Sequence, residues 1–421
     1  MDRSPLCLRS FLALFRRSFQ PKFCRLAPHK YLAIYNNLSY RFWHMKKNAT
    51  IVDIASALGI STATVHRALH NRDHIKSATR EKVLQMARNL GYRPNRAARS
   101  LSLKRKLRVS VNTLQGTTSF WNEVRAGIES EAQSCNGAVD LEFRTYPRLG
   151  EGEEEALVDA LQAEADGVIL FPSRPAKLRS WMRRAAKSEI PIVCVAADVL
   201  ETGRLAAVTI DTKVSGAMAA DLLGSQLPAG GKVAVTVSDF AITEHMEKLN
   251  SFEHTLKMFY PGIHLVSAIE DHDMESETYE KCVALFRSEP DLAGIYITTE
   301  ASGPVLKAAR HVGCLEKLRV VATDLFPLLM DEIRSGTVVA SIYQQPRVQG
   351  SMALQVLIDY LMEGDRPSTR LTLAPHLVMR GSMDMFLQRR DLETDLAQAR
   401  HLSHAASSRP FTPENRIARD A

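Results

Sequence analysis

Residues 50–69 contain two short helical patterns separated by a glycine, and this feature limits the possible folds of the N-terminal part most strongly. Apolar residues recur at helical spacing in the first pattern, at Ile51, Ile54, Ala55 and Leu58. Gly59 then permits a tight turn that a residue with a Cβ resists, and Ser61 is a favourable N-cap for a second helix. The buried stripe of that helix is predicted at Val65, Ala68 and Leu69. We therefore predict a helix-turn-helix, whose second helix enters the major groove of DNA.

A third helix and a short fourth helix are predicted after this motif. The third begins between Ser77 and Thr79, and its apolar face consists of Val83, Met86, Ala87 and Leu90. Gly91 is a typical residue just beyond a helix end. After Pro94, residues 95–103 can form two helical turns. A helix this short is marginal alone in water, so it needs a partner helix or DNA.

The order of these elements resembles the lactose-repressor (LacI/GalR) family of bacterial transcriptional regulators. The resemblance covers roughly residues 46–386 and is most specific over residues 50–103, including the segment "GYRPN" at 91–95. It implies an all-α helix-turn-helix head followed by an α/β core similar to type I periplasmic binding proteins. In that core, two parallel-sheet subdomains are joined by three crossovers and close on a small ligand.

The resemblance also implies DNA-contacting roles for individual residues. The recognition-helix positions that read bases are matched by Thr62, Ala63 and Arg67. Positions near phosphates are matched by Ser61, Thr64 and His74. The hinge helix is matched by Asn95, Ala98 and Leu101, of which the leucine inserts into the minor groove. His66 stands where the family usually has serine, which leaves a different operator preference open at that contact.

The chemistry of these side chains agrees with the roles that the resemblance implies. Ser61, Thr64 and the helix N-terminus can donate hydrogen bonds to phosphate oxygens. Arg67 can contact a guanine through two hydrogen bonds, which is worth about 1–3 kcal/mol of discrimination. Thr62 and Ala63 suit a thymine methyl group, and Leu101 can unstack a base step. A single exposed arginine is usually only a solvated side chain, but the surrounding pattern favours base contact here.

Positive charge is concentrated in the N-terminal part of the chain. Residues 45–108 hold fifteen Lys and Arg against three acidic residues, a net charge of +12. Residues 1–44 add +7, and because the whole chain is only +7, residues 109–421 carry −12. A basic N-terminal part beside an acidic body indicates a polyanionic partner, which we expect to be double-stranded DNA.

The six cysteines and the first 44 residues say little about function. The cysteines are scattered without a C-x-x-C pair, so we expect buried or idle thiols in a reducing cytoplasm. Residues 1–44 are interpreted as an extension from an upstream start codon or as a disordered basic arm, because Met45 resembles the usual family start. No stretch reaches the roughly 20 apolar residues of a membrane helix.

From about residue 107 the pattern changes to strands that alternate with amphipathic helices. The predicted strands are short apolar runs at 109–113, 166–171, 192–195, 208–210, 232–237, 263–266, 294–297 and 319–322. Continuous apolar strands joined by crossover helices indicate parallel sheets covered on both faces. We expect an N-terminal subdomain at about 107–227 plus 346–368. The C-terminal subdomain is expected at 232–342 plus a strand near 371–380.

These observations predict five segments along the chain. Listed from the N-terminus, they are the extension 1–44, the helix-turn-helix domain 45–94, the hinge helix and linker 95–106, the bilobed effector-binding and dimerisation domain 107–386, and the tail 387–421. The tail becomes polar and charged and is predicted to be largely disordered. Its few apolar residues fall short of sustained heptads, so a tetramer-forming coiled coil is not inferred.

Ligand-binding residues are expected at the carboxyl ends of strands that face the cleft. The candidates are Phe120, Trp121, Asp211, Thr299, Glu300, Asp324 and Gln344. The resemblance to sugar-binding members supports Asp211, Asp324 and Gln344 in particular. Carboxylates and amides can bond hydroxyl groups, while an aromatic ring packs on the apolar face of a sugar. The alternatives are that Asp211 caps the following helix and that the two aromatic residues belong to the core.

Two departures from sugar-binding family members leave the effector open. Met246 stands where an arginine is frequent, and Thr299-Glu300 stands where Asn-Asp is usual. The effector is therefore expected to be a sugar or polyol-like molecule, with a modified sugar or an unrelated small molecule as alternatives.

Motifs for catalysis, cofactors or metals are not found in the sequence. Residues 227–232 are similar to a phosphate loop, but Gln226 stands where the leading glycine belongs and Val233 replaces Ser or Thr. The acidic run Glu151–Glu155 is interpreted as a solvated helix start rather than as a metal site. We therefore expect no enzyme activity, no cofactor and no metal.

The sequence predicts a DNA-binding transcriptional regulator, by resemblance a repressor, whose operator affinity a small-molecule effector modulates. A homodimer would place two recognition helices in successive major grooves of a near-palindromic operator. The expected location is the cytoplasm, with the nucleoid, and no membrane partner is expected. The alternative is a solute-binding protein of the same core fold, which lacks a DNA-binding head and needs an export signal.

Overall fold

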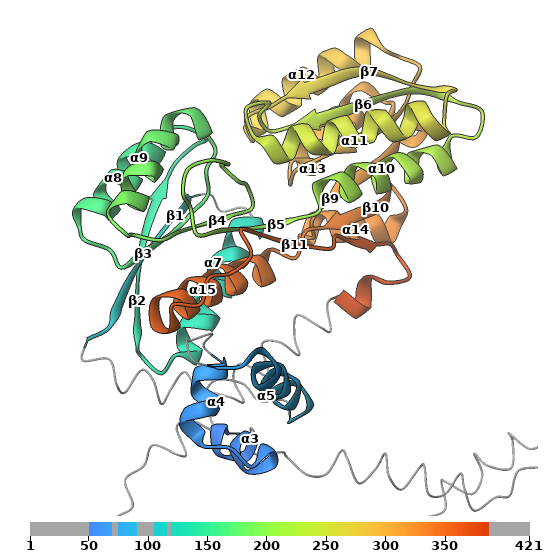
Figure 1. The fold of residues 1–421 in the computed structure, drawn as a ribbon. Helices are drawn as coiled ribbons and strands as arrows, with labels where there is room; N and C mark the ends of the chain where they lie inside the picture. The colour runs from blue at the N-terminus through green and yellow to red at the C-terminus, as the bar shows by residue number, and fades with distance from the viewer. Residues whose placement is uncertain (1–49, 70–74, 91–104, 116–118, 387–421) are drawn as a thin grey trace, which may run out of the picture. The chain divides into compact units, whose positions relative to one another are not determined.

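The computed structural model describes residues 50–69, 75–90, 105–115 and 119–386 (Figure 1). The chain divides into two compact units, Met1–Pro94 and Asn95–Ala421, which are described separately. The predicted extension 1–44, the hinge helix at 95–103 and the tail 387–421 lie outside the described residues.

Three helices form the head in the first unit: α3 (Ile51–Leu58), α4 (Thr62–Leu69) and α5 (Ser77–Leu90). Helix α3 begins with a capping box, in which the Asp53 carboxylate accepts a hydrogen bond of 2.7 Å from the Thr50 backbone N–H. It ends at Gly59, whose φ of +63° is the left-handed conformation that glycine adopts without strain. Helix α4 follows at once, so the predicted helix-turn-helix is confirmed.

A single apolar cluster holds the three head helices together. Its fully buried members, each with 0% exposure, are Ile54, Val65, Ala68 and Val83. The other predicted apolar positions pack within or against the same cluster, at Ile51, Ala55, Leu58, Leu69, Met86, Ala87 and Leu90. The helical spacing in the sequence therefore identified the core of the head correctly.

The first lobe of the second unit is built on a six-stranded parallel sheet. The strand order is β11-β5-β4-β3-β1-β2. The strands are β1 (Leu107–Leu114), β2 (Val139–Tyr146), β3 (Gly167–Leu170), β4 (Ile192–Val195), β5 (Ala206–Ile210) and β11 (Arg370–Leu373). Helices α7 (Ser119–Ser134) and α15 (Pro346–Glu363) cover one face, and α8 (Glu153–Gln162) and α9 (Pro175–Lys187) cover the other.

The second lobe repeats this architecture with one reversed edge strand. Its sheet has the order β12-β10-β9-β8-β6-β7, in which β12 is antiparallel to β10. The strands are β6 (Gly231–Val237), β7 (Ile263–Glu270), β8 (Leu292–Ile297), β9 (Arg319–Thr323), β10 (Val338–Tyr343) and β12 (His376–Val378). One face carries α10 (Thr212–Gln226) and α11 (Thr243–Phe259), and the other carries α12 (Glu275–Ser288), α13 (Ser302–Val312) and α14 (Pro327–Ser335). A short 3-10 helix, Leu315–Lys317, precedes β9.

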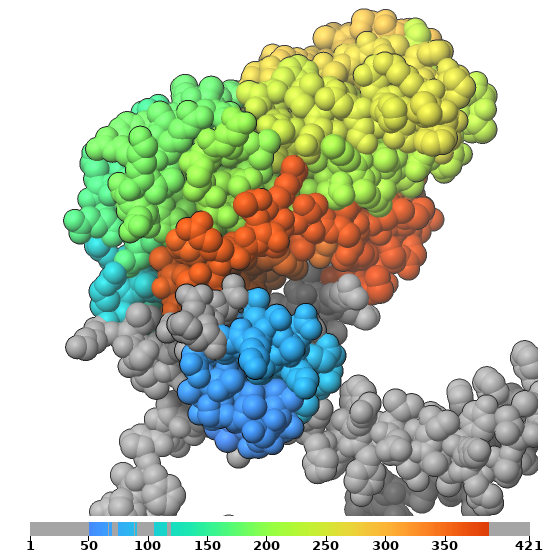
Figure 2. All heavy atoms as spheres, viewed as in Figure 1, coloured from blue at the N-terminus to red at the C-terminus, as the bar shows by residue number. Residues whose placement is uncertain are grey.

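The chain crosses between the lobes three times, as predicted. The crossings lie between β5 and α10, between β10 and α15, and between β11 and β12. In Figure 2 the last part of the core, coloured orange to red, runs along both lobes. Two lobe assignments made from the sequence are wrong. Helix α10 was expected in the first lobe but packs against α11 in the second, and β11 was expected in the second sheet but pairs with β5 in the first.

Close helix packing explains the position of α10. A Cβ on Gly216 would lie only 2.2 Å from the carbonyl oxygen of Lys248, so the backbones of α10 and α11 touch at this point. The corresponding contact in the first lobe joins α7 and α15, where a Cβ on Gly127 would lie 2.0 Å from the carbonyl oxygen of Arg347. Each lobe therefore holds a glycine-dependent helix pair against its sheet.

Four cysteines fall within the described residues, and all four are free thiols. Cys135, Cys194 and Cys282 are buried, and Cys314 is partly buried. This confirms the expected state for these four. None of the helices in the described ranges combines the length and the apolar character that a membrane crossing requires.

Candidate nucleic-acid interface and effector cleft

The N-terminus of α4 presents the predicted DNA-contacting residues on the head. Ser61 caps the helix, because its Oγ accepts a hydrogen bond of 3.1 Å from the Thr64 backbone N–H. The two hydroxyl oxygens of Ser61 and Thr64 lie 2.8 Å apart. Thr62 and Ala63 are exposed on the first turn. The structure therefore brings these four residues together at one helix end.

Arg67 lies one turn further along α4 and is also exposed. Its Nε donates to the carbonyl oxygen of Ala63 at 3.3 Å, a long contact that costs little to break. The guanidinium group can therefore be redirected toward a base edge. The backbone of His66 lies in the same helix. The remaining predicted contacts lie outside the described residues, at His74, Asn95, Ala98 and Leu101.

A cleft of about 1070 Å³ lies between the two lobes of the second unit. Segments that follow the carboxyl ends of strands in both sheets line it, as expected for α/β proteins. Six of the seven predicted ligand residues line this cleft, namely Phe120, Trp121, Thr299, Glu300, Asp324 and Gln344. Asp211 is not among the lining residues. Its carboxylate instead caps α10 by accepting from the Val214 backbone N–H at 3.0 Å, so its expected place in the cleft is corrected.

The aromatic residues that form one wall of the cleft also pack in the core of the first lobe. Trp121 is only 6% exposed, and its ring lies 4.5 Å from that of Phe171 and 5.0 Å from that of Phe120. All three side chains line the cleft. The alternative that these residues belong to the core is confirmed, and their rings also line the cavity, so that their contact with a ligand stays a prediction.

A polar network spans the floor of the cleft in the second lobe. The Asp324 carboxylate accepts hydrogen bonds from Gln344, 3.0 Å from its backbone N–H and 2.6 Å from its side-chain Nε2. Lys248 Nζ donates to the Gln344 Oε1 at 2.8 Å and to the Thr298 carbonyl oxygen at 3.0 Å. Burial raises the pKa of Asp324 to about 6 and lowers the pKa of Lys248 to about 8. Lys248 was not predicted from the sequence, because charged residues seldom signal burial.

Glu300 connects the two lobes across the cleft. It follows β8 in the second lobe, and its two carboxylate oxygens accept hydrogen bonds of 2.9 Å from the backbone N–H groups of Ser119 and Phe120. These N–H groups belong to the first turn of α7 in the first lobe, where the helix dipole favours negative charge. Glu300 therefore links the two lobes through these two hydrogen bonds.

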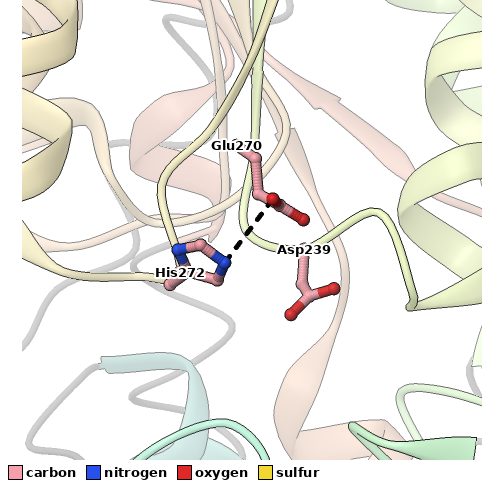
Figure 3. A group of neighbouring side chains, drawn as sticks. All are labelled: Asp239, Glu270 and His272. Carbon is pink, nitrogen blue, oxygen red and sulfur yellow. Dashed lines mark ion pairs between the residues drawn. The ribbon is translucent and has the colours of Figure 1, made fainter.

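A second interlobe contact involves a group of titratable residues at the edge of the cleft. Figure 3 shows Asp239, Glu270 and His272 side by side, with His272 Nε2 3.5 Å from a Glu270 oxygen. These residue types can bind a metal ion, and their ligand atoms lie within 4.8 Å of one another. However, Arg174 of the first lobe already forms an ion pair with the buried Asp239. Arg174 therefore already supplies a positive charge to this group, and these residues form an ion-pair cluster between the two lobes.

Glu153 holds the backbone of Arg174 in place. Its carboxylate accepts from the Ser173 Oγ at 2.8 Å and from the Arg174 backbone N–H at 3.1 Å. The acidic run at 151–155 does begin a helix, but Glu153 is only 2% exposed. The expectation of a solvated helix start is therefore wrong for this residue, because its carboxylate caps the loop before α9.

Two neighbouring titratable groups at the start of α11 also line the cleft. Glu244 is 3% exposed, and neither of its carboxyl oxygens has a hydrogen-bond partner among the described residues. Burial raises its pKa to about 8. His245 Nδ1 accepts from the Asp239 backbone N–H at 3.4 Å, and desolvation lowers the pKa of this imidazole below its usual range.

Comparison with known families agrees with both units. The family "Bacterial regulatory proteins, lacI family" matches residues 50–95, which include the helix-turn-helix. A periplasmic binding protein domain matches residues 109–365, which is more than half of the chain.

Relatives of similar length are regulatory proteins. The catabolite control protein A of Priestia megaterium is 27% identical over 342 residues, covering 79% of this chain and 98% of the relative. The transcriptional repressor PurR of Vibrio vulnificus is 23% identical over 350 residues, covering 80% and 98%.

Solved structures share the fold of the second unit. A glucose-galactose binding protein from Geobacillus stearothermophilus has a TM-score of 0.62 at 20% identity and covers 66% of this chain and 99% of its own. A fructose-binding periplasmic domain of a hybrid two-component system has a TM-score of 0.65 at 17% identity and covers 71% and 99%. The helix-turn-helix head distinguishes this chain from such binding proteins, and with its periplasmic-binding-protein core it belongs to the lacI family of transcriptional regulators.

Proposed function

We propose that this regulator binds a near-palindromic operator as a homodimer and represses transcription, and that a small effector in the cleft modulates its affinity for DNA. The observation that carries the proposal is the exposed N-terminus of α4, where Ser61 and Thr64 can hold phosphates and Arg67 can reach a base edge. Repression is the role that the names of several relatives give, including the repressors ExuR of Bacillus subtilis and PurR of Vibrio vulnificus.

The effector is proposed to be a small polyhydroxylated molecule. The cleft is large enough to hold such a ligand, and it combines an aromatic wall with the network of Asp324, Gln344 and Lys248. Similar structures hold D-arabinose in a protein from Burkholderia graminis and myo-inositol in one from Bacillus halodurans. We further infer that the chain binds its effector without converting it, in the bacterial cytoplasm.

Control of DNA binding is proposed to follow from movement of the lobes. An effector that favours one lobe arrangement would alter the spacing of the two hinge segments at 95–103 in a dimer. By thermodynamic reciprocity, DNA must then change the affinity for the effector by the same factor. A solute-binding role for the same core is disfavoured because such a role does not use a helix-turn-helix.

Selection from random duplex DNA tests the DNA-binding part of the proposal. Purified full-length protein, incubated with a randomised pool at low ionic strength, is expected to enrich one two-fold symmetric sequence. Arg67→Ala is then expected to relax preference at one base pair in each half-site by about 1–3 kcal/mol, measured by fluorescence anisotropy.

Lys82→Ala provides the matched control, since Lys82 is an exposed base on α5 of the same head. Any effect of this change is expected to be equal for all sequences. Failure of the protein to enrich any sequence would overturn the proposed function. Unchanged selectivity in Arg67→Ala would remove Arg67 from base recognition.

A further inference from the structure

Acidic side chains outnumber basic ones around the cleft. Six lining residues carry a carboxyl group: Glu244, Asp273, Glu275, Glu280, Glu300 and Asp324. Only three lining residues are Lys or Arg: Arg148, Lys248 and Lys307. With this balance the cavity favours cations over anions, because a bound cation stabilises the ionised form of carboxyl groups whose pKa burial raises, such as Glu244 and Asp324.

The hydrogen-bond donors on the cleft floor are already engaged. Lys248 donates to Thr298 and Gln344, and the Gln344 side chain donates to Asp324. The backbone N–H groups of Ser119 and Phe120 donate to Glu300. The floor of the cleft therefore offers few free donors to a ligand.

Glu244 is the acceptor that lacks a partner. Both of its oxygens are buried without a hydrogen bond among the described residues, a state that costs free energy until a donor arrives. Arg370 favours the charged form of Glu244 but bonds Glu247 at 3.3 Å, and Arg204, which also interacts with Glu244, is paired with Asp198. Asp198 and Glu247 also act on Glu244, and both oppose its ionisation. The carboxyl group thus lies in a region where negative charge is under-compensated.

We propose that the effector carries a protonated amine on a polyhydroxylated skeleton, an amino sugar in the simplest case, and that Glu244 receives the N–H donors of this amine. An ammonium group has three donors and no acceptor, which complements a cleft with surplus acceptors. The apolar face of a sugar ring would pack on the wall of Phe120, Trp121 and Phe171. This inference rests on the proposed function, since it names the effector of the same cleft.

Neutral and anionic ligands fit less well. Each hydroxyl group brings lone pairs as well as one donor, so a neutral sugar adds acceptors to a site that already has an excess. A carboxylate or phosphate would meet Glu300 at the N-terminus of α7, where that side chain already takes the two N–H groups. The charge balance of the lining therefore selects the amine.

Isothermal titration calorimetry on the full-length protein tests the inference with a panel of matched sugars. Glucosamine and galactosamine carry the amine, glucose and galactose lack it, and N-acetylglucosamine has the same nitrogen without charge. At pH 6.5 at least one of the two amino sugars is expected to bind tighter than its neutral counterparts by about tenfold or more, which equals about 1.4 kcal/mol. Equal affinities, preference for a neutral sugar, or no binding by either amino sugar would overturn the inference.

Two variants on the same helix test the role of Glu244. Glu244→Gln keeps the size and removes the acid that a bound ammonium group can hold ionised, and it is expected to lower amino-sugar affinity by about tenfold while leaving glucose affinity unchanged. Glu253→Gln is the control, because Glu253 lies on α11 but does not line the cleft. If Glu244→Gln does not fold, the sugar panel on the unaltered protein still tests whether the cleft prefers a ligand with an amine.

Operator binding is measured on the same preparations by fluorescence anisotropy. Selective operator binding without a preference for amino sugars would overturn only the inference about the effector, and the proposed regulatory function would stand. Absence of any sequence preference for DNA would instead count against the proposed function.

Discussion

Burial changes the chemistry of single side chains in the cleft according to their partners. Asp324 and Lys248 are both 3% exposed, yet each has hydrogen bonds to Gln344 that compensate for lost water. Asp324 also has a φ of +64°, an uncommon conformation that places it next to the Gln344 backbone. Glu244 is equally buried but has no such compensation. Of these three residues, Glu244 has the largest pKa shift, so we expect it to respond most strongly to pH.

We predict that Glu244→Gln alters the pH dependence of stability. The folded-state pKa of Glu244 is raised from 4.5 to about 8, so the folded protein retains this proton where the unfolded chain has lost it. The resulting stability is present below pH 4.5 and is lost as pH rises through about 8. The variant is therefore expected to match the original protein at pH 4.5 and to exceed its free energy of unfolding by about 1–3 kcal/mol at pH 9.

Urea unfolding at a series of pH values measures this difference. Glu253→Gln serves as control, since Glu253 is on the same helix and pairs with Lys257 at the surface. Its difference from the original protein should not grow between pH 5 and pH 9. Parallel pH profiles for Glu244→Gln and the original protein would show that Glu244 is not a buried, unpaired acid.

At the scale of elements, local patterns predicted what depends on local sequence. The helical stripes of the head and most core strands follow from apolar spacing, and they are found where expected. Strand β2 was not predicted, because it is an edge strand with exposed polar residues such as Glu142, which pairs with Arg144. The site was predicted less completely. Glu244 and Lys248 were not selected because charged residues seldom signal burial, and only the tertiary packing of α11 buries them.

Local sequence patterns also could not predict the lobe to which α10 belongs. It depends on the point at which the chain leaves the first sheet, and on the contact of Gly216 with α11. Asp211 illustrates the same limit, because its place directly after β5 suits either a cleft residue or a cap. The structure assigns it to the cap, since the chain turns into the second lobe at this residue.

We predict that Gly216→Ala destabilises the second lobe and weakens effector binding together. The new Cβ would lie 2.2 Å from the Lys248 carbonyl oxygen and 2.9 Å from the Phe252 backbone nitrogen. The two helices must separate, at an expected cost of about 1–3 kcal/mol in the free energy of unfolding. The shift also moves Lys248 away from Gln344. Guanidinium unfolding and calorimetry with the sugar panel measure the two effects.

Gly381→Ala is the matched control for this prediction. A Cβ at Gly381 would meet no atom within 4 Å, and its φ is not positive. This substitution is expected to leave both stability and ligand binding close to those of the original protein. If Gly216→Ala proved equally harmless, the close approach of α10 and α11 would be wrong.

At the scale of the whole ligand-binding unit, polar contacts join the two lobes, including the bond between Arg370 of β11 and Glu247 of α11. Glu300 holds the first turn of α7, and Arg174 pairs with the buried Asp239. A ligand changes the lobe arrangement only as far as it binds one arrangement better than the other. These contacts add to the stability of the described lobe arrangement, so they set how much differential affinity an effector that favours another arrangement must supply.

We predict that Arg174→Ala shifts the lobes toward a more open arrangement. The change leaves the Asp239 carboxylate buried without its ion partner, and separation of the lobes relieves this cost because it exposes Asp239 to water. Spin labels on cysteines introduced at the exposed positions Lys177 of α9 and Glu280 of α12 report the distance between the lobes by double electron–electron resonance. A longer or broader distance distribution is expected in the variant.

Arg183→Ala is the control for the interlobe prediction, because Arg183 lies on α9, the helix that follows Arg174, and its side chain donates to the Glu201 carbonyl oxygen within the first lobe. It should leave the distance distribution unchanged. A lobe shift must also affect DNA, since the lobes and the operator are coupled in the proposed mechanism. Operator affinity in Arg174→Ala is therefore expected to differ from that of the original protein by about tenfold, equivalent to about 1.4 kcal/mol. A more open distribution with identical operator affinity would disconnect lobe movement from DNA binding, and the allosteric part of the proposal would fail while DNA recognition by α4 stood.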